Sequence, residues 1–187
     1  LAEPDWQYLK QQTETSFNLA EAFAVVELWG VRNSTCELKA KELLHAWTGK
    51  PVVCGHEISG TLNSLRRAAS ALLNARLLPL INTFLDAVRN SLAGRKITAP
   101  LVIVRSDGSL MAESVARERP VETLLSGPAA SVAGGLALTG LKSGIVVDMG
   151  GTTSDVAMVR DGQPVMAAQG TQIGTWRTGI HSILIQT

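Results

Sequence analysis

The sequence predicts an α/β fold in which a mixed sheet is flanked by helices. Short apolar runs typical of strands alternate along the chain with longer stretches whose apolar residues recur at helical spacing. Near the N-terminus the order is strand, helix, strand, which predicts a parallel pair of strands joined by a right-handed crossover. With 187 residues, of which 45% are hydrophobic, the chain is long enough to bury a substantial core.

Residues 1–60 are predicted to form a β-α-β segment that follows an N-terminal helix. This first helix is predicted because Trp6 and Phe17 recur with other apolar residues among polar neighbours. Residues 22–30, AFAVVELWG, are a continuous apolar run ended by glycine and are predicted to be the first strand. Residues 50–55, KPVVCG, are predicted to be the second strand.

Between these two strands, residues 34–47 are predicted to form a helix. Ser34 or Thr35 is the expected N-cap, and Glu37 stands near the third helical position, where a capping box places an acidic side chain. The expected buried stripe of this helix consists of Leu38, Leu43, Leu44 and Trp47.

Residues 61–95 are predicted to be a helical segment, and residues 96–187 to be a separate α/β part of the chain. Pro79 interrupts the helical pattern and predicts either two helices or one kinked helix. Farther on, the Asp-Gly pair in RSDGSLM predicts a hairpin, and the SGP tripeptide starts a helix of small residues. Two more strand pairs follow, one within residues 144–160 and one around Asp161-Gly162.

Composition argues against several classes of partner. The net charge of +1 gives no electrostatic basis for binding nucleic acid, and aromatic residues are too few for a base-stacking platform. No stretch approaches the roughly 18–20 uninterrupted apolar residues of a membrane span, so no membrane partner is expected. Cys36 and Cys54 form no CxxC motif, and they are interpreted as reduced thiols of a cytoplasmic protein.

Most common catalytic motifs are absent from the sequence. It contains no GxSxG elbow, no Walker A loop and no GxGxxG that opens a helix. His45, His56 and His181 lack metal-ligand spacing and are interpreted as surface or locally bonded residues. The pair His56-Glu57, just after a predicted strand, is a weak candidate for the edge of a site.

The stretch GIVVDMGGTTSDVAMVR, residues 144–160, has an unusually polar turn between two strands predicted to be buried. Asp148 at the end of the first strand needs a cation or hydrogen-bond donors, and Gly150 and Gly151 allow backbone N–H groups to approach an anion. The alternative is a plain tight turn, with glycines for positive φ and hydroxyls for solubility. We interpret the stretch as a phosphate-binding hairpin in which Asp148 and Asp155 are available to Mg²⁺.

Ser126 and Gly127 open the small-residue helix SGPAASVAGG, whose N-terminus is the positive end of a dipole and a candidate contact for an anion. The alternative is a buried helix that packs closely against another element through its small residues.

This helix, followed by strand, D-x-G-G-T-x-x-D and strand, resembles the second phosphate motif of the actin-like ATPase superfamily. More narrowly, the chain resembles the hydantoinase A/5-oxoprolinase family of ATP-dependent amidohydrolases, which also contains carboxylase subunits. Five stretches carry this resemblance: GHEISG, LNARLLPL, RSDGSLM, ARERPVETLLSGPAASVAGG and VVDMGGTTSDVAMVRDG. IGTWRT resembles a further stretch of one branch. As a departure, Arg66-Arg67 and the three residues that follow stand where many members have Tyr-Glu-Arg-Thr.

The resemblance implies that residues 96–187 are half of an actin-like, ribonuclease H-like ATPase domain. It implies that Asp148 orients Mg²⁺ (or another divalent cation) or an attacking water, and that Asp155 supports the metal or the hairpin. Gly150, Gly151, Thr152 and Thr153 are implied to contact the β- and γ-phosphates of ATP, with Ser126 and Gly127 as further cofactor contacts.

The activity implied by the resemblance is ATP-dependent opening of a small cyclic amide such as a hydantoin or 5-oxoproline, together with a second subunit or domain. A sugar-kinase-like or carboxylase-type phosphotransferase subunit is the first alternative, and a non-catalytic module is the second. Neither the first phosphate hairpin of the superfamily nor its nucleoside-binding glycine loop is found in the sequence. The chain is therefore expected to be a fragment with weak or absent nucleotide binding and no turnover of its own.

Overall fold

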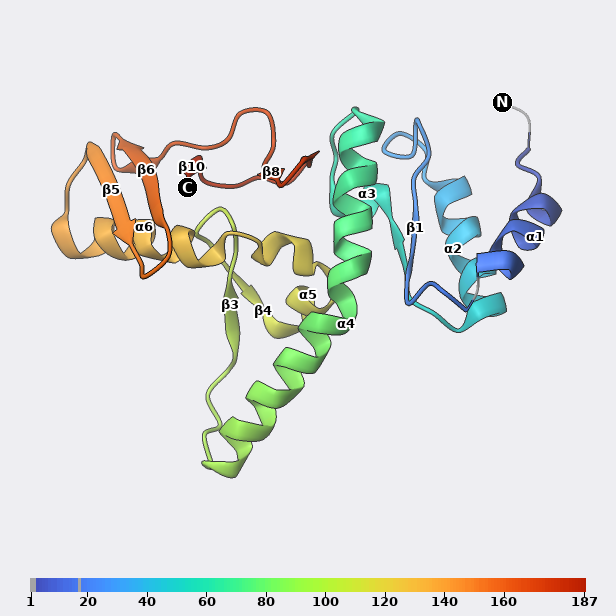
Figure 1. The fold of residues 1–187 in the computed structure, drawn as a ribbon, viewed down its shortest axis with the longest axis horizontal. Helices are drawn as coiled ribbons and strands as arrows, with labels where there is room; N and C mark the ends of the chain where they lie inside the picture. The colour runs from blue at the N-terminus through green and yellow to red at the C-terminus, as the bar shows by residue number, and fades with distance from the viewer. Residues whose placement is uncertain (1–2, 17) are drawn as a thin grey trace. The chain divides into compact units, whose positions relative to one another are not determined.

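The computed structural model describes residues 3–16 and 18–187 of the chain. The chain divides into two compact units, and α4 contributes residues to both. Unit 1 comprises Leu1–Leu80 and Trp176–Gly179, and unit 2 comprises Ile81–Thr175 and Ile180–Thr187. Figure 1 shows the elements in chain order, from blue at the N-terminus to red at the C-terminus.

Unit 1 contains a parallel pair of strands connected through a helix. Its elements are α1 (Trp6–Ser16), β1 (Phe23–Val25), α2 (Thr35–Thr48), β2 (Val52–Cys54), α3 (Gly55–Ile58) and the first part of α4 (Ser64–Gly94). Phe23, Ala24 and Val25 pair in parallel with the three residues of β2, which confirms the predicted β-α-β order. The predicted N-terminal helix is confirmed over α1, whereas Phe17 lies outside the described residues.

The first strand is shorter than predicted, because it ends at Val25 although the apolar run continues to Gly30. After Val25 the backbone forms turns, and the N–H of Glu27 donates to the side chain of Glu37 instead of to a neighbouring strand. A side-chain acceptor thus replaces the strand partner that the apolar run was expected to have.

Helix α2 has the predicted bounds to within one residue, but it begins and packs differently. Ser34 occupies the N-cap position as predicted, but it makes no side-chain capping bond, so the capping box is not formed. Asn33 Oδ1 instead accepts from the N–H and the hydroxyl of Thr35. Glu37 is fully buried, whereas Leu38, expected in the buried stripe, is 41% exposed. The buried face of α2 is formed by Glu37, Ala40 and Leu44.

Helix α4 is a single element of 31 residues with Pro79 inside it, so the alternative of two separate helices is wrong. By length and composition it could also cross a membrane, a property that it shares with the core helices of soluble proteins. This is weak support for a span, and the absence of a membrane partner stays a prediction.

Unit 2 begins with the second part of α4 and an antiparallel hairpin. The hairpin consists of β3 (Val102–Val104) and β4 (Leu110–Ala112), and Gly108 in its turn has a φ of 83°, as the predicted Asp-Gly turn requires. Helices α5 (Glu113–Glu118), η1 (Pro120–Thr123) and α6 (Ser126–Thr139) follow. Leu85, Met111 and Ala116 form a buried cluster that joins the hairpin to α4 and α5.

A small antiparallel sheet completes unit 2. It consists of β10 (Ile185–Gln186), β6 (Ser154–Arg160) and β5 (Gly144–Met149) in that order, with β7 (Gln163–Pro164) also paired to β6. Before β10 the chain contains two short strands, β8 (Gln172–Ile173) in unit 2 and β9 (Trp176–Arg177) in unit 1. The fold is thus mixed α/β as predicted, but the parallel and antiparallel pairs of the described residues belong to separate sheets.

Within the described part of the chain, one face of the β5–β6 hairpin is covered and the other is exposed. Ala129 and Val132 of α6 pack with Ala157, Val159 and Ile183 in a buried cluster, and Val146, Leu136 and Ile185 lie against it. On the other face, large apolar side chains are exposed: Ile145, Val147, Met149, Val156 and Met158. The prediction that both strands are buried is therefore wrong for the described chain, because alternate residues of a strand point to opposite faces.

Candidate functional site

The two carboxylates predicted to bind metal lie directly opposite each other in the β5–β6 hairpin. Asp148 of β5 pairs with Asp155 of β6 in the antiparallel register, so both side chains lie on the same face of the sheet. This is the face that packs on α6 through Val146 and Ala157. Both aspartates are half-buried, and the four residues of the loop between the strands are exposed.

A hydroxyl group holds each of these carboxylates. Ser131 Oγ, from α6, donates to Asp148 Oδ2 at 2.6 Å. Thr187 Oγ1 donates to Asp155 Oδ1 at 2.6 Å. Sequence reasoning missed Ser131, although a hydroxyl within an otherwise apolar small-residue helix was a usable signal.

The glycines of the loop are not required by its backbone conformation. Neither Gly150 nor Gly151 has a positive φ. A Cβ added to Gly151 would meet nothing within 4 Å, and one added to Gly150 would meet only the carbonyl of Thr153, at 3.5 Å. The plain-turn alternative explained the glycines by positive φ, so that explanation is wrong. The two glycines leave the backbone of the loop open to the approach of an external group.

Donors for such a group are present in the loop. The N–H of Gly150 is already bonded to the carbonyl of Thr153 at 3.0 Å and closes the turn. Among the described residues, no hydrogen bond engages the N–H groups of Gly151 and Thr152 or the hydroxyl groups of Thr152 and Thr153. The loop therefore presents unpaired donors beside two carboxylates, an arrangement suited to a phosphate with a bound divalent cation.

Ser126 and Gly127 begin α6, as predicted, but no hydrogen bond joins either of them to the hairpin within the described part of the chain. Ser131, which does reach the hairpin, follows Ser126 by five residues, or about 7.5 Å along a helix axis.

The alternative, a helix that packs through its small residues, is confirmed for one face of α6: Ala129 is buried, and a Cβ on Gly135 would lie 3.6 Å from Val146. A Cβ on Gly127 or Gly134 would meet nothing within 4 Å, so these two glycines are not part of that packing.

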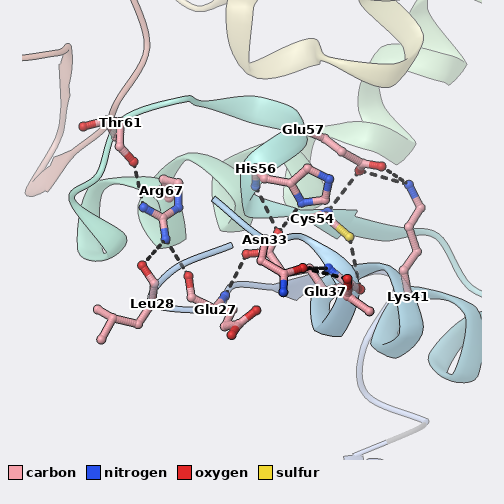
Figure 2. Close-up of polar contacts among 11 residues, drawn as sticks. Glu27, Leu28, Asn33, Glu37, Lys41, Cys54, His56, Glu57, Thr61 and Arg67 are labelled. Carbon is pink, nitrogen blue, oxygen red and sulfur yellow. Dashed lines mark hydrogen bonds and ion pairs between the residues drawn. The ribbon is translucent and has the colours of Figure 1, made fainter. Parts of the chain in front are cut away.

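A second polar cluster, not predicted from the sequence, surrounds Glu37 in unit 1 (Figure 2). Glu37 Oε1 accepts from the N–H of Glu27 at 2.7 Å. Its Oε2 accepts from the N–H of His56 at 3.0 Å and lies 2.5 Å from Nδ1 of the same histidine. The buried carboxylate thus joins the loop after β1, helix α2 and the start of α3.

The protonation states in this cluster follow from its contacts. Burial raises the pKa of Glu37, but the hydrogen bonds from Glu27 and His56 outweigh it, so the pKa lies below its ordinary value and the carboxylate is ionised. Burial raises the pKa of the Cys54 thiol to about 12, and the nearby carboxylates of Glu57 and Glu37 add to this. Cys54 is therefore a protonated thiol, and its Sγ donates to the backbone carbonyl of Glu37.

The predicted pair His56-Glu57 is divided between two networks. Glu57 bonds to Lys41 Nζ at 2.7 and 2.9 Å, and it accepts from the N–H of Cys54 at 3.2 Å. His56 belongs to the Glu37 cluster instead. By contrast, the ring of His45 bonds through Nδ1 to the nearby carbonyl of Lys50, as expected of a locally bonded histidine.

A buried arginine lies beside the same loop. Arg67 of α4 is fully buried, and its guanidinium donates to the backbone carbonyls of Glu27, Leu28 and Thr61 (Figure 2). Its Nε has no hydrogen-bond partner in the described residues. Together, Arg67 and Glu37 bond both backbone groups of Glu27, because Arg67 donates to its carbonyl and Glu37 accepts from its N–H.

Known proteins share sequence with this chain. The sequence profile of the hydantoinase/oxoprolinase family matches residues 67–187. The chain is 28% identical over 171 residues to the caprolactamase subunit alpha of Pseudomonas jessenii, covering 89% of the chain and 24% of that protein. It is 27% identical over 150 residues to an uncharacterised protein of Methanocaldococcus jannaschii, covering 78% of the chain and 22% of the relative.

Two solved structures share the fold. The crystal structure of the ATP-dependent caprolactamase from Pseudomonas jessenii matches with a TM-score of 0.75 at 25% identity, over 96% of this chain and 26% of that one. A nucleotide-free acetone carboxylase matches with a TM-score of 0.72 at 16% identity, over 94% and 26%. The chain therefore spans about a quarter of the length of these relatives.

Proposed function

Because the chain belongs to the hydantoinase/oxoprolinase family, we propose that it is part of an ATP-dependent enzyme that opens cyclic amides. The similarity to a caprolactamase supports this class of substrate, since a lactam, a hydantoin and 5-oxoproline share a cyclic amide bond. The relative is named as an alpha subunit, which supports a second subunit as partner. In this proposal the chain binds the phosphates of ATP. We further propose that residues 96–187 belong to an actin-like domain and that the protein is cytoplasmic.

The hairpin tip is the observation that carries this proposal. Asp148 and Asp155 would hold Mg²⁺, and the free N–H groups of Gly151 and Thr152 would donate to phosphate oxygens, with the hydroxyls of Thr152 and Thr153 beside them. Ser131 orients Asp148. Bound Mg²⁺–ATP supplies the phosphoryl group that activates the amide oxygen, whereas the chain positions the phosphates and neutralises their charge.

A carboxylase-type subunit is the second candidate, and the fold shared with acetone carboxylase favours it. The two candidates use the same hairpin and differ in the acceptor of the phosphoryl group. Product analysis of the full-length enzyme with ATP and either a cyclic amide or a ketone plus bicarbonate distinguishes them.

Replacing Asp148 with asparagine tests the hairpin directly. In the full-length enzyme, Asp148→Asn is expected to weaken Mg²⁺–ATP binding at least about tenfold, because a metal-binding carboxylate is lost. Isothermal titration calorimetry measures this affinity. Asp161→Asn is the matched control: it makes the same charge change in the exposed turn after β6, at a φ of 52° that asparagine tolerates. Equal affinities of Asp148→Asn and wild type contradict the proposal.

Gly151→Ala separates a ligand-binding role of the loop from a role in its folding. A methyl group at this position meets no protein atom and no positive φ, so stability is expected to be unchanged or to rise by up to about 1 kcal/mol. Mg²⁺–ATP affinity should nevertheless fall, because the methyl group occupies the path of the phosphates. Thermal unfolding and ATP titration are measured on the same samples.

Gly162→Ala is the control, because it is expected to lower stability and to leave ATP affinity unchanged, the opposite of Gly151→Ala. Gly162 has a φ of 76° in the turn between β6 and β7, so alanine there is expected to cost about 1 kcal/mol of stability and to leave ATP affinity unchanged. If Gly151→Ala destabilises the protein as Gly162→Ala does and keeps full ATP affinity, the loop is a structural turn.

A further inference from the structure

His56 is held by a buried carboxylate in a way that leaves one ring nitrogen unused. We propose that His56, oriented by Glu37, is the general base that accepts a proton from the attacking water when the cyclic amide is opened. This proposal rests on the proposed function, since it assigns a residue to the hydrolytic half of that reaction. It places proton transfer on residues of unit 1, separate in sequence from the phosphate-binding hairpin.

The contacts of Glu37 determine which nitrogen of His56 carries the proton. An ionised carboxylate can only accept hydrogen bonds, so Nδ1, which lies 2.5 Å from Glu37 Oε2, carries a proton. In the neutral form of the ring, the free electron pair is therefore on Nε2. The side chain of His56 is 20% exposed, and Nε2 has no hydrogen-bond partner among the described residues. A base needs both features: an available lone pair and access from outside.

The carboxylate that orients His56 is itself rigidly held. Glu37 is fully buried, and the backbone N–H groups of Glu27 and His56 fix its two oxygens. Gly30 is close enough that a Cβ there would lie 2.2 Å from Glu37 Oε1, so the absence of a side chain at Gly30 leaves room for the carboxylate. A buried carboxylate of this kind fixes the ring orientation and stabilises the imidazolium that forms when Nε2 takes a proton.

Two other roles for the cluster agree less well with the contacts. Ligand atoms of Glu37, Cys54 and His56 lie within 4.8 Å of one another, as in a metal site. However, Nδ1 of His56 is engaged in a hydrogen bond with Glu37, and the Cys54 thiol is protonated and bonded to a carbonyl, whereas a metal needs an unprotonated nitrogen and a thiolate. A purely structural brace would use Nδ1 and the backbone N–H of His56, but it gives no role to Nε2.

The proposed step is a proton transfer coupled to addition of water. As the water oxygen bonds to the activated carbonyl carbon, one of its protons passes to Nε2. The ring becomes an imidazolium whose charge is balanced by Glu37. When the C–N bond breaks, its electron pair remains on the ring nitrogen of the substrate, and the proton on Nε2 is transferred to that nitrogen. The histidine is thereby returned to its neutral form. The acyl carbon keeps the phosphorylated oxygen, and a second water molecule then releases phosphate from this acyl phosphate to give the carboxylate.

His56→Asn in the full-length enzyme tests this role, because it preserves the brace and removes the base. The amide nitrogen of asparagine occupies nearly the position of Nδ1 and can donate to Glu37, but asparagine has no equivalent of Nε2. We expect ATP-dependent hydrolysis of caprolactam, hydantoin or 5-oxoproline to fall by about 10²–10⁴-fold in kcat. Mg²⁺–ATP affinity and thermal stability should be unchanged.

His45→Asn is the matched control, since His45 also bonds through Nδ1 but to a backbone carbonyl in an exposed position on α2. It is expected to leave kcat unchanged. The proposal is overturned if His56→Asn keeps wild-type kcat, or if it loses ATP affinity together with activity. Wild-type enzyme that binds no Mg²⁺–ATP contradicts the proposed function instead, so the two failures are distinguishable.

A spectroscopic readout tests the dyad independently of turnover. In ¹⁵N-histidine-labelled enzyme, the signals that disappear in His56→Asn belong to His56. At a pH where the ring is neutral, Nε2 is expected to give the shift of an unprotonated nitrogen and Nδ1 that of a protonated one. The reverse assignment leaves Nε2 unable to accept a proton and overturns the proposal, whatever substrate the enzyme uses.

Discussion

Replacing Glu37 with alanine is expected to lower the free energy of unfolding by about 3–5 kcal/mol. The substitution removes the acceptor of three donors: the N–H of Glu27, the N–H of His56 and its Nδ1–H. Because Glu37 is fully buried, water reaches these donors poorly once the carboxylate is gone. Urea denaturation followed by tryptophan fluorescence measures the loss.

Glu42→Ala is the control for this prediction, because Glu42 is an exposed residue of the same helix. It should change stability by no more than about 0.5 kcal/mol. A loss for Glu37→Ala that is no larger than the loss for Glu42→Ala shows that the cluster around Glu37 contributes little to folding.

The contribution of Glu37 should also depend on pH, with a definite sign. Burial raises the pKa of Glu37, but the hydrogen bonds from Glu27 and His56 bring it below the ordinary value of 4.5. A group with a lowered pKa stabilises the fold above its unfolded pKa and loses that contribution as the pH falls through its folded pKa. The stability difference between wild type and Glu37→Ala is therefore expected to be complete at neutral pH and to shrink below pH 4.5. A constant difference down to pH 3 contradicts the ionised state.

Arg67→Ala is expected to cost about 2–4 kcal/mol, because it removes the donors of three backbone carbonyls and leaves a cavity in place of the buried side chain. Arg67→Lys should recover only part of this loss, since an ammonium cannot reproduce the planar fork of a guanidinium. Thermal unfolding compares both variants with Arg66→Ala, which alters the half-buried neighbour. If Arg66→Ala is as damaging as Arg67→Ala, the carbonyl contacts of Arg67 are not what stabilises this region.

Local sequence signals predicted the elements that local physics determines. The Asp-Gly turn, the small-residue helix and the β5–β6 hairpin are all observed, because turn chemistry and apolar periodicity act over a few residues. The strand at 22–30 was overestimated for the same reason. Its apolar run is genuine, but a side chain ten residues away takes the N–H of Glu27.

The clusters that the sequence did not predict depend on contacts between distant residues. Glu37 and His56 are 19 residues apart, and Arg67 reaches Glu27 across 40. The spacing rule assigned Glu37 to a helix cap because an acidic residue stands in the first turn of the helix. The rule does not show which backbone N–H groups elsewhere in the chain lack a partner. Asp148 was predicted as a site residue, whereas its partner Ser131 lies 17 residues earlier and became visible only when α6 was placed against β5.

The opposed pair Asp148 and Asp155 has a thermodynamic consequence. Like charges directly across an antiparallel pair weaken it, so the two strands are held together against a repulsion. Any cation that bridges the carboxylates removes that repulsion, and the free energy released appears as tighter strand pairing. By mass action, a divalent ion that binds the folded hairpin stabilises it, so its melting temperature is expected to rise as its occupancy by the ion rises.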